Sequence, residues 1–118
     1  KVRFMAFYES TFIARQDIST SDIEKLTKEF SELVTKLGGK VIKDEYWGLR
    51  NLAYLVKKNK KGHYVMLGID APADAVKELD RKLRLHDDVI RNVTIRVDSI
   101  SNEPSAPIRE ERYEKKAA

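Results

Sequence analysis

The chain has 118 residues, of which 36% are charged, with a formal net charge of +4 and no cysteine. The length predicts a single domain, and the absence of cysteine excludes disulfides, thiolate zinc sites and a cysteine nucleophile. No apolar run approaches the ~18 residues of a membrane-spanning helix, and no apolar segment follows the charged first residues as it would in a secretory signal.

The first predicted element is a strand within residues 2–14, which are rich in aromatic and β-branched side chains. Alternation places Tyr8, Ser10 and Phe12 on one face and Phe7, Glu9, Thr11 and Ile13 on the other. Neither set is wholly polar, so we expect a central strand that is covered on at least part of both faces.

A helix is predicted next, and two caps compete for its start: Ser19 with Asp22, and Ser21 with Glu24. Its apolar side chains recur at spacings of three, four and seven: Ile23, Leu26, Phe30, Leu33, Val34 and Leu37. This pattern predicts one buried helix face. The pair Gly38–Gly39 is expected to end the helix, because glycine adopts the left-handed conformation without steric cost.

Residues 40–58 predict a long second strand with a β-bulge at Gly48. Residues 59–62 are expected to form a hairpin connection, and residues 63–69 a buried third strand. Pro72 is expected at the first position of a second helix, whose apolar stripe comprises Ala75, Val76, Leu79 and Leu83. Residues 89–97 alternate cleanly and predict a fourth strand.

This order of elements predicts an α+β fold of the ferredoxin-like, split βαβ type. Its four-stranded antiparallel sheet would carry both helices on one face and leave the other face open. The domain is expected to span residues 1–99. Residues 100–118 contain two of the three prolines and mixed charges, and we expect them to form a flexible C-terminal tail.

The sequence offers little for catalysis. The two histidines, His63 and His86, have no second histidine or carboxylate at a metal-ligand spacing. Asp44 and Glu45 would point to opposite faces of a strand and could not share a proton. No phosphate-binding glycine loop or nucleophile motif is present. We therefore predict a protein that is not an enzyme and uses neither a metal nor a cofactor.

Cations gather in two places. Seven lie between residues 40 and 63 against two acids, and Arg84, His86 and Arg91 surround the loop before the last strand. Such a local excess favours phosphate binding, because affinity grows with the counterions released. Two structural roles compete with this interpretation: lysines at a hairpin tip also protect a sheet edge, and Arg84 also complements a helix C-terminus.

The open sheet face is predicted to be apolar, with Phe7, Ile13, Trp47 and Leu49. Such a face suits a protein partner; a homodimer or a merely half-buried face are the alternatives. Stacking of RNA bases there is disfavoured, because residues 61–67 lack the alternating aromatics of single-strand RNA readers.

Several motifs together resemble the bacterial-type small-subunit ribosomal protein six family. The most specific is Trp47-Gly48-Leu49-Arg50-Asn51-Leu52-Ala53-Tyr54-Leu55-Val56-Lys57. Similar residues fall at Met5–Glu9, Lys61–Tyr64, Asp70–Pro72 and Asp87–Arg91. The resemblance covers roughly residues 5–108 in order.

The resemblance implies a structural protein of the small ribosomal subunit. Such a protein would bind the central domain of small-subunit ribosomal RNA as a heterodimer with ribosomal protein eighteen, without a membrane or a small-molecule substrate. The RNA-binding candidates are Arg50, Lys57, Arg84, His86 and Arg91. The partner-binding candidates are Trp47 and Leu49 and, in the tail, Pro104, Pro107 and Ile108.

We expect a cytoplasmic location, and the sequence leaves an organellar ribosome open. The competing hypothesis is a ferredoxin-like regulatory module that dimerises through its open sheet face and binds a small anion. Such a module would more often offer a pocket with a few convergent polar groups. An acyl-phosphate type hydrolase on this fold would need a glycine-rich anion loop after the first strand, and none is present.

Overall fold

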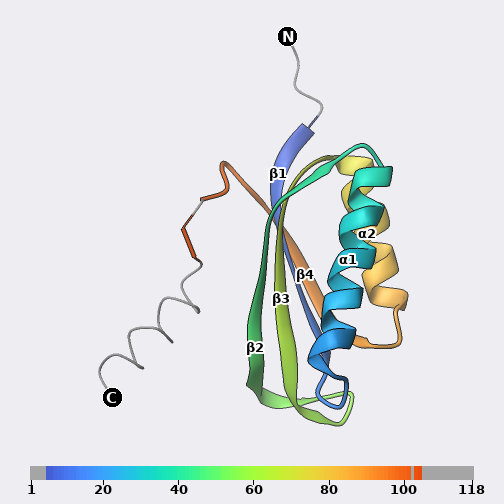
Figure 1. Cartoon of the computed structure of the whole chain (residues 1–118), viewed down its shortest axis with the longest axis vertical. Coiled ribbons are helices and arrows are strands. Elements are labelled where there is room, and N and C mark those ends of the chain that lie inside the picture. The colour runs from blue at the N-terminus through green and yellow to red at the C-terminus, as the bar shows by residue number, and fades with distance from the viewer. Residues whose placement is uncertain (1–4, 102, 105–118) are drawn as a thin grey trace.

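The protein is described by a computed structural model that covers residues 5–101, 103 and 104. Its elements are β1 (Met5–Arg15), α1 (Thr20–Lys36), β2 (Lys40–Val56), β3 (Asn59–Pro72), α2 (Ala73–Leu85) and β4 (Val89–Val97). The strands form one antiparallel sheet in the order β2-β3-β1-β4. Both helices cover the same face of this sheet (Figure 1), so the predicted fold class is confirmed.

The position of β1 agrees with its predicted character. It pairs with β3 on one side and with β4 on the other, and is therefore a central strand. Phe12 and Ala14 are fully buried on the helix side. Phe7, Glu9 and Thr11 alternate with them and therefore point to the open face.

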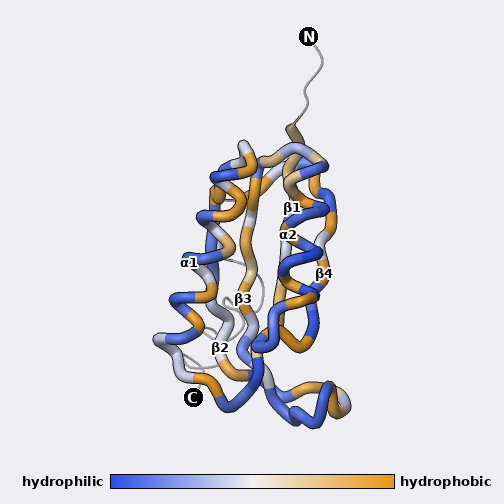
Figure 2. The backbone as a smooth tube through the Cα atoms, turned by 90° about the vertical axis from the view of Figure 1, so that its right-hand side faces the viewer, coloured by the Kyte–Doolittle hydropathy of each residue, from blue (hydrophilic) through white to orange (hydrophobic). Residues whose placement is uncertain are grey.

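The core lies between the sheet and the two helices, which stand side by side in front of the sheet in Figure 2. Its fully or nearly fully buried members include Phe12, Ile23, Phe30, Val34, Val65, Leu67, Ile69, Leu79 and Leu83. Burying one such side chain contributes about 1.5–3 kcal/mol. The apolar stripes predicted for both helices supply the helix side of this core.

The structure decides how α1 begins and ends. Ser19 is the N-cap, and its Oγ accepts a hydrogen bond from Asp22 N at 3.1 Å. At the other end Gly38 has φ +93°, and Gly39 N donates to Val34 O at 2.9 Å. This is the Schellman arrangement, which satisfies carbonyls that the helix leaves unpaired. The predicted role of the two glycines is confirmed.

Two predicted boundaries were wrong. The β2–β3 connection is the two-residue turn Lys57–Lys58, with φ of 47° and 69°, whereas residues 59–62 belong to β3. Both turn residues have positive φ, as a type I′ hairpin requires, although lysine is rarely found there. Pro72 is the N-cap of α2 rather than its first helical residue.

Candidate nucleic-acid and protein interface

Three loops meet at the lower end of the molecule in Figure 1: the β1–α1 connection, the β2–β3 turn and the α2–β4 loop. Arg15 joins two of them, since its N donates to Asp88 O at 2.9 Å and its Nη2 lies 3.1 Å from Asp88 Oδ1. Gln16 reaches β3, where its N donates to Asn59 Oδ1 and its Oε1 accepts from Lys61 N. The fold thus brings the two cation-rich segments to one end.

Arg84 and Arg91 flank the same loop but belong to different layers. Arg84 is exposed in the last turn of α2. Arg91 is exposed on β4 and pairs with Ile13, which places it on the open face. A ligand that contacts both arginines must therefore pass around the end of the sheet.

His86 is already held by neighbouring groups. It is the C-cap residue of α2, and its Nδ1 accepts a hydrogen bond from Asp88 N at 3.1 Å. Because Nδ1 is the acceptor, the ring carries its proton on Nε2, which lies 3.4 Å from Glu29 Oε2. The ring also packs edge-on against Phe30, with centroids 5.7 Å apart. An RNA phosphate would have to compete with Glu29 for this histidine.

Arg50 lies on the open face beside an aromatic pair. It pairs with Gly62 of β3, and its Nε donates to Trp47 O at 2.9 Å. With Trp47, Tyr64 and Lys61 it borders a shallow cavity of about 470 Å³. Leu49 and Asn51 border the same cavity from β2, which is an edge strand of the sheet. This cavity combines two cations with aromatic surface, a combination that suits an anionic or a stacking group.

The β-bulge at Gly48 changes the direction of the side chains that follow it. The register shifts between Tyr46 and Gly48, and Gly48 has φ +92°. Trp47 stacks on Tyr64, with centroids 6.4 Å apart, and so belongs to the open face. Leu49 pairs with His63 and therefore points to the helix side. The prediction that Leu49 shares the open face with Trp47 was wrong, because the bulge inserts one residue.

A second irregularity was not predicted. Asn51 pairs with Lys61 and Val56 pairs with Asn59, so residues 52–55 stand opposite a single residue of β3. Within this segment the Tyr54 side chain is 65% exposed, and its Oη accepts a hydrogen bond from Arg91 Nη1 at 3.3 Å. The hairpin therefore swings beneath the lower end of β4 (Figure 2). Residues 52–55 form an apolar run that is typical of a buried strand, but this run lies at the surface.

The open face is apolar in part. Ile13 is only 7% exposed, because the missing side chain of Gly62 leaves room for it: a Cβ there would lie 2.2 Å from Ile13 Cγ2. Val93 and Ile95 of β4, which pair with Thr11 and Glu9, are 59% and 54% exposed. The alternation of residues 89–97 already indicated that Val93 and Ile95 share one face of β4. The predicted open face nevertheless did not include these two side chains.

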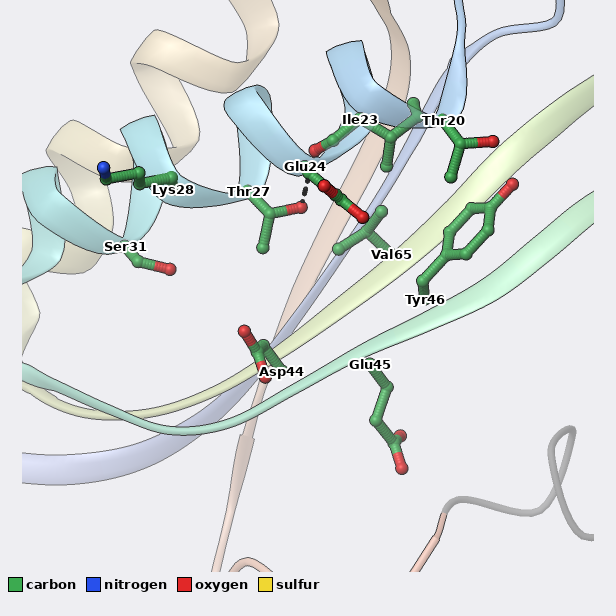
Figure 3. Close-up of a pocket in the computed structure, with 10 residues that line it drawn as sticks. All are labelled: Thr20, Ile23, Glu24, Thr27, Lys28, Ser31, Asp44, Glu45, Tyr46 and Val65. Carbon is green, nitrogen blue, oxygen red and sulfur yellow. Dashed lines mark hydrogen bonds between the residues drawn. The ribbon is translucent and has the colours of Figure 1, made fainter.

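A separate cavity of about 490 Å³ lies on the helix side, between α1 and β2 (Figure 3). Glu24, Lys28 and Asp44 are its charged side chains on that side, whereas Glu45 points away from α1 in Figure 3. Two carboxylates against one lysine are unfavourable for a small anion. Tyr46 borders the cavity, its Oη lies 2.7 Å from His63 Nδ1, and burial raises the pKa of its hydroxyl.

Within residues 5–101, 103 and 104, no group of three or more histidine and carboxylate side chains is placed to hold a metal ion. None of the helices in that part of the chain is long and apolar enough to cross a membrane.

Comparison with known proteins adds the decisive observation. Residues 7–96 match the family described as Ribosomal protein S6. The chain belongs to this family. The small ribosomal subunit protein bS6 of Paramagnetospirillum magneticum is 59% identical over 86% of this chain and 71% of that protein. The bS6 protein of Rickettsia prowazekii is 49% identical over 93% of this chain and 91% of that protein.

Solved structures agree. The crystal structure of 30S ribosomal protein S6 from Thermotoga maritima has a TM-score of 0.74 and 26% identity, and the match covers 96% of this chain and 97% of that chain. The predicted family resemblance is thus confirmed, and the chain is a structural protein of the small ribosomal subunit.

In this ribosomal protein S6 family member, the predicted site residues fall into two groups. Arg50 and Arg91 lie on the open face, and Lys57 at the hairpin tip, all toward the lower end. Arg84 and His86 stand on the helix side of the same end. Among the partner-binding candidates, Trp47 lies on the open face and Pro104 is half-buried. Pro107 and Ile108 lie outside the described residues.

Proposed function

We propose that this protein binds the central domain of small-subunit ribosomal RNA together with ribosomal protein eighteen, and that it has no catalytic activity and no cofactor. The observation that carries the proposal is the sheet face that the helices leave open, whose lower end is rich in cations. Family membership supports the ribosomal role. On the same grounds we propose a cytoplasmic ribosome as its location.

The RNA would contact the lower end. Arg50, Lys57 and Arg91 would reach it from the open face and the hairpin tip, and Arg84 and His86 from the C-terminal end of α2. Phosphate binding needs several cations in reach of one backbone, because each neutralised phosphate releases counterions. Arginines also contact phosphate in a bidentate manner that lysine cannot reproduce.

The protein partner would cover the open face. Trp47 with Tyr64 offers an aromatic platform near one edge, and Val93 with Ile95 offers exposed apolar surface near the other. Large aromatic side chains surrounded by apolar surface are favoured anchors in protein interfaces. Leu49 lies on β2, an edge strand of the sheet, and is 47% exposed. It would contact a partner that wraps around that edge of the sheet. Pro104, Pro107 and Ile108 would add the tail.

Binding to a central-domain RNA fragment, measured with and without ribosomal protein eighteen across a salt series, tests the proposal. We expect weak binding alone and tight, salt-dependent binding together. Arg91→Glu should weaken RNA binding and reduce the salt slope by about 1 for each phosphate that is no longer neutralised. Arg84→Glu should act in the same direction.

Matched controls carry the same charge change elsewhere. Arg96→Glu alters the same strand as Arg91 but at its upper end, and Lys77→Glu alters the same helix as Arg84 but near its start. If the control variants weaken binding as much as the site variants, the lower end is not the RNA site. If binding ignores ribosomal protein eighteen, the heterodimer proposal fails.

A further inference from the structure

The start of the C-terminal tail lies against the open face of the sheet. Residues 100, 101, 103 and 104, here called the tail root, leave β4 and emerge on the side of the sheet opposite the helices (Figure 1). Two independent contacts hold the tail root there.

The first contact is a notch at Gly68. Leu67 and Ile69 are buried on the helix side, so a side chain at Gly68 would point to the open face. A Cβ at this position would lie 3.1 Å from Ile100 Cγ2 and 3.2 Å from Ile100 Cδ1. Ile100 thus occupies the space that any other residue at position 68 would fill.

The second contact is Lys43 on β2, the strand neighbour of Gly68. Its Nζ donates to Ser101 O at 3.0 Å and to Glu103 O, and lies 3.7 Å from Glu45 Oε2. The Lys43 and Glu45 side chains are only 15% and 9% exposed. Covered charges cost free energy unless they are paired, so this network favours one fixed position of the tail root.

The path from β4 to the notch at Gly68 is short. From β4, where Val97 pairs with Phe7, the chain crosses two strand spacings, about 10 Å in all, before it reaches Gly68. The three residues from Val97 to Ile100 span at most about 11 Å. The short connection therefore keeps Ile100 close to the sheet, and the contacts at Gly68 and Lys43 fix where it lies.

The clamp is also joined to the candidate partner surface. Glu45 contacts Lys43 through one oxygen and accepts a hydrogen bond from Trp47 Nε1 through the other, at 3.1 Å. Trp47 in turn stacks on Tyr64. The tail root and the aromatic platform are thus neighbours on one face, connected by one carboxylate.

We propose that Lys43, Gly68 and Ile100 form a clamp that fixes the tail root on the open face before any partner arrives. Ribosomal protein eighteen then meets the sheet and the tail root as one preformed surface. This inference rests on the proposed function. A surface ordered in advance binds more tightly, because its ordering entropy is lost on folding and not on binding.

The clamp itself is tested in the free protein. The chain has no cysteine and one tryptophan, so a nitroxide on Glu103→Cys is a unique probe and the Trp47 Nε1–H resonance a unique reporter. We expect the nitroxide to broaden this resonance. Gly68→Val, which fills the notch, and Ile100→Asp, which alters only the tail root, should both restore it.

Lys43→Met should also restore the resonance, and Lys40→Met, on the same strand without these contacts, should not. Because Ile100→Asp leaves the sheet unchanged, the test does not depend on whether Gly68→Val folds. A Trp47 signal that the nitroxide never broadens overturns the clamp.

A second experiment measures the affinity of the protein and its variants for ribosomal protein eighteen. The three clamp variants should weaken it about tenfold, and Lys40→Met should leave it unchanged. Clamp variants that free the tail root without any loss of affinity overturn the preformed surface. If the unaltered protein does not bind ribosomal protein eighteen, the proposed function fails, whereas the nitroxide experiment still decides whether the clamp exists.

Discussion

A buried polar group between α2 and the sheet offers the sharpest stability test. Thr94 Oγ1 of β4 lies 2.6 Å from Asp80 Oδ1 of α2 and 3.0 Å from Ser10 Oγ of β1. Ser10 is completely buried. Thr94 Oγ1 is placed as the donor to both oxygens, and because a hydroxyl carries one hydrogen, the carboxylate and Ser10 Oγ share it. These bonds fix α2 one turn before Arg84.

Thr94→Val keeps the shape of the side chain and removes both hydrogen bonds. A hydrogen bond to a charged group is worth about 1.5–3 kcal/mol, and a buried donor left without a partner costs about 1–3 kcal/mol. Asp80 is half-buried and regains some hydration, so the lower ends of these ranges apply. We expect the free energy of unfolding to fall by about 2–4 kcal/mol.

Urea unfolding followed by Trp47 fluorescence and by circular dichroism measures this loss. Adding Ser10→Ala to Thr94→Val should recover about 1 kcal/mol, because the orphaned Ser10 hydroxyl is then gone. The control Thr35→Val replaces an exposed threonine whose hydroxyl bonds only to its own helix. A loss for Thr94→Val no larger than that of the control would refute the reasoning.

Two further predictions concern the hairpin and Tyr46. Replacing Lys57–Lys58 by Asn-Gly should raise the free energy of unfolding by about 0.5–1 kcal/mol, since these residues adopt the positive φ of the turn without strain; a loss in urea unfolding would contradict the turn geometry. Burial raises the pKa of the Tyr46 hydroxyl above its value in the unfolded chain. The contribution of Tyr46 to the free energy of unfolding is therefore fully present below about pH 10, and it is lost as the pH rises through the folded-state pKa. Tyr46→Phe should therefore lose less stability than the parent between neutral pH and pH 11, as measured by urea unfolding at each pH.

The regular parts of the fold were predictable because their signals are local. The stripe from Ile23 to Leu37 and the alternation from Val89 to Val97 report burial through periodicity alone. The order of elements then leaves few chain paths. The paired glycines after α1 end the helix as expected, since the left-handed conformation of Gly38 is a local property of the backbone.

The irregular parts were not predictable. Lysine is not a typical turn residue, so Lys57 and Lys58, which have positive φ, gave no sign of a turn. The predicted connection was placed at residues 59–62 because Asn59 and Gly62 are typical turn residues. The bulge at Gly48 was expected, but its effect on Leu49 depends on which residue of β3 stands opposite. Such register is set by pairing between distant segments, which one sequence does not reveal.

The sequence by itself determined the family, the fold class and the types of residue available for phosphate and partner contacts, because these follow from local pattern and motif. Only the tertiary structure decided how they are arranged. It placed Arg84 and Arg91 on opposite layers, swung Tyr54 across to Arg91, and laid Ile100 into the notch at Gly68. Each of these contacts joins residues that are distant in the chain, so its geometry exists only once the sheet has formed.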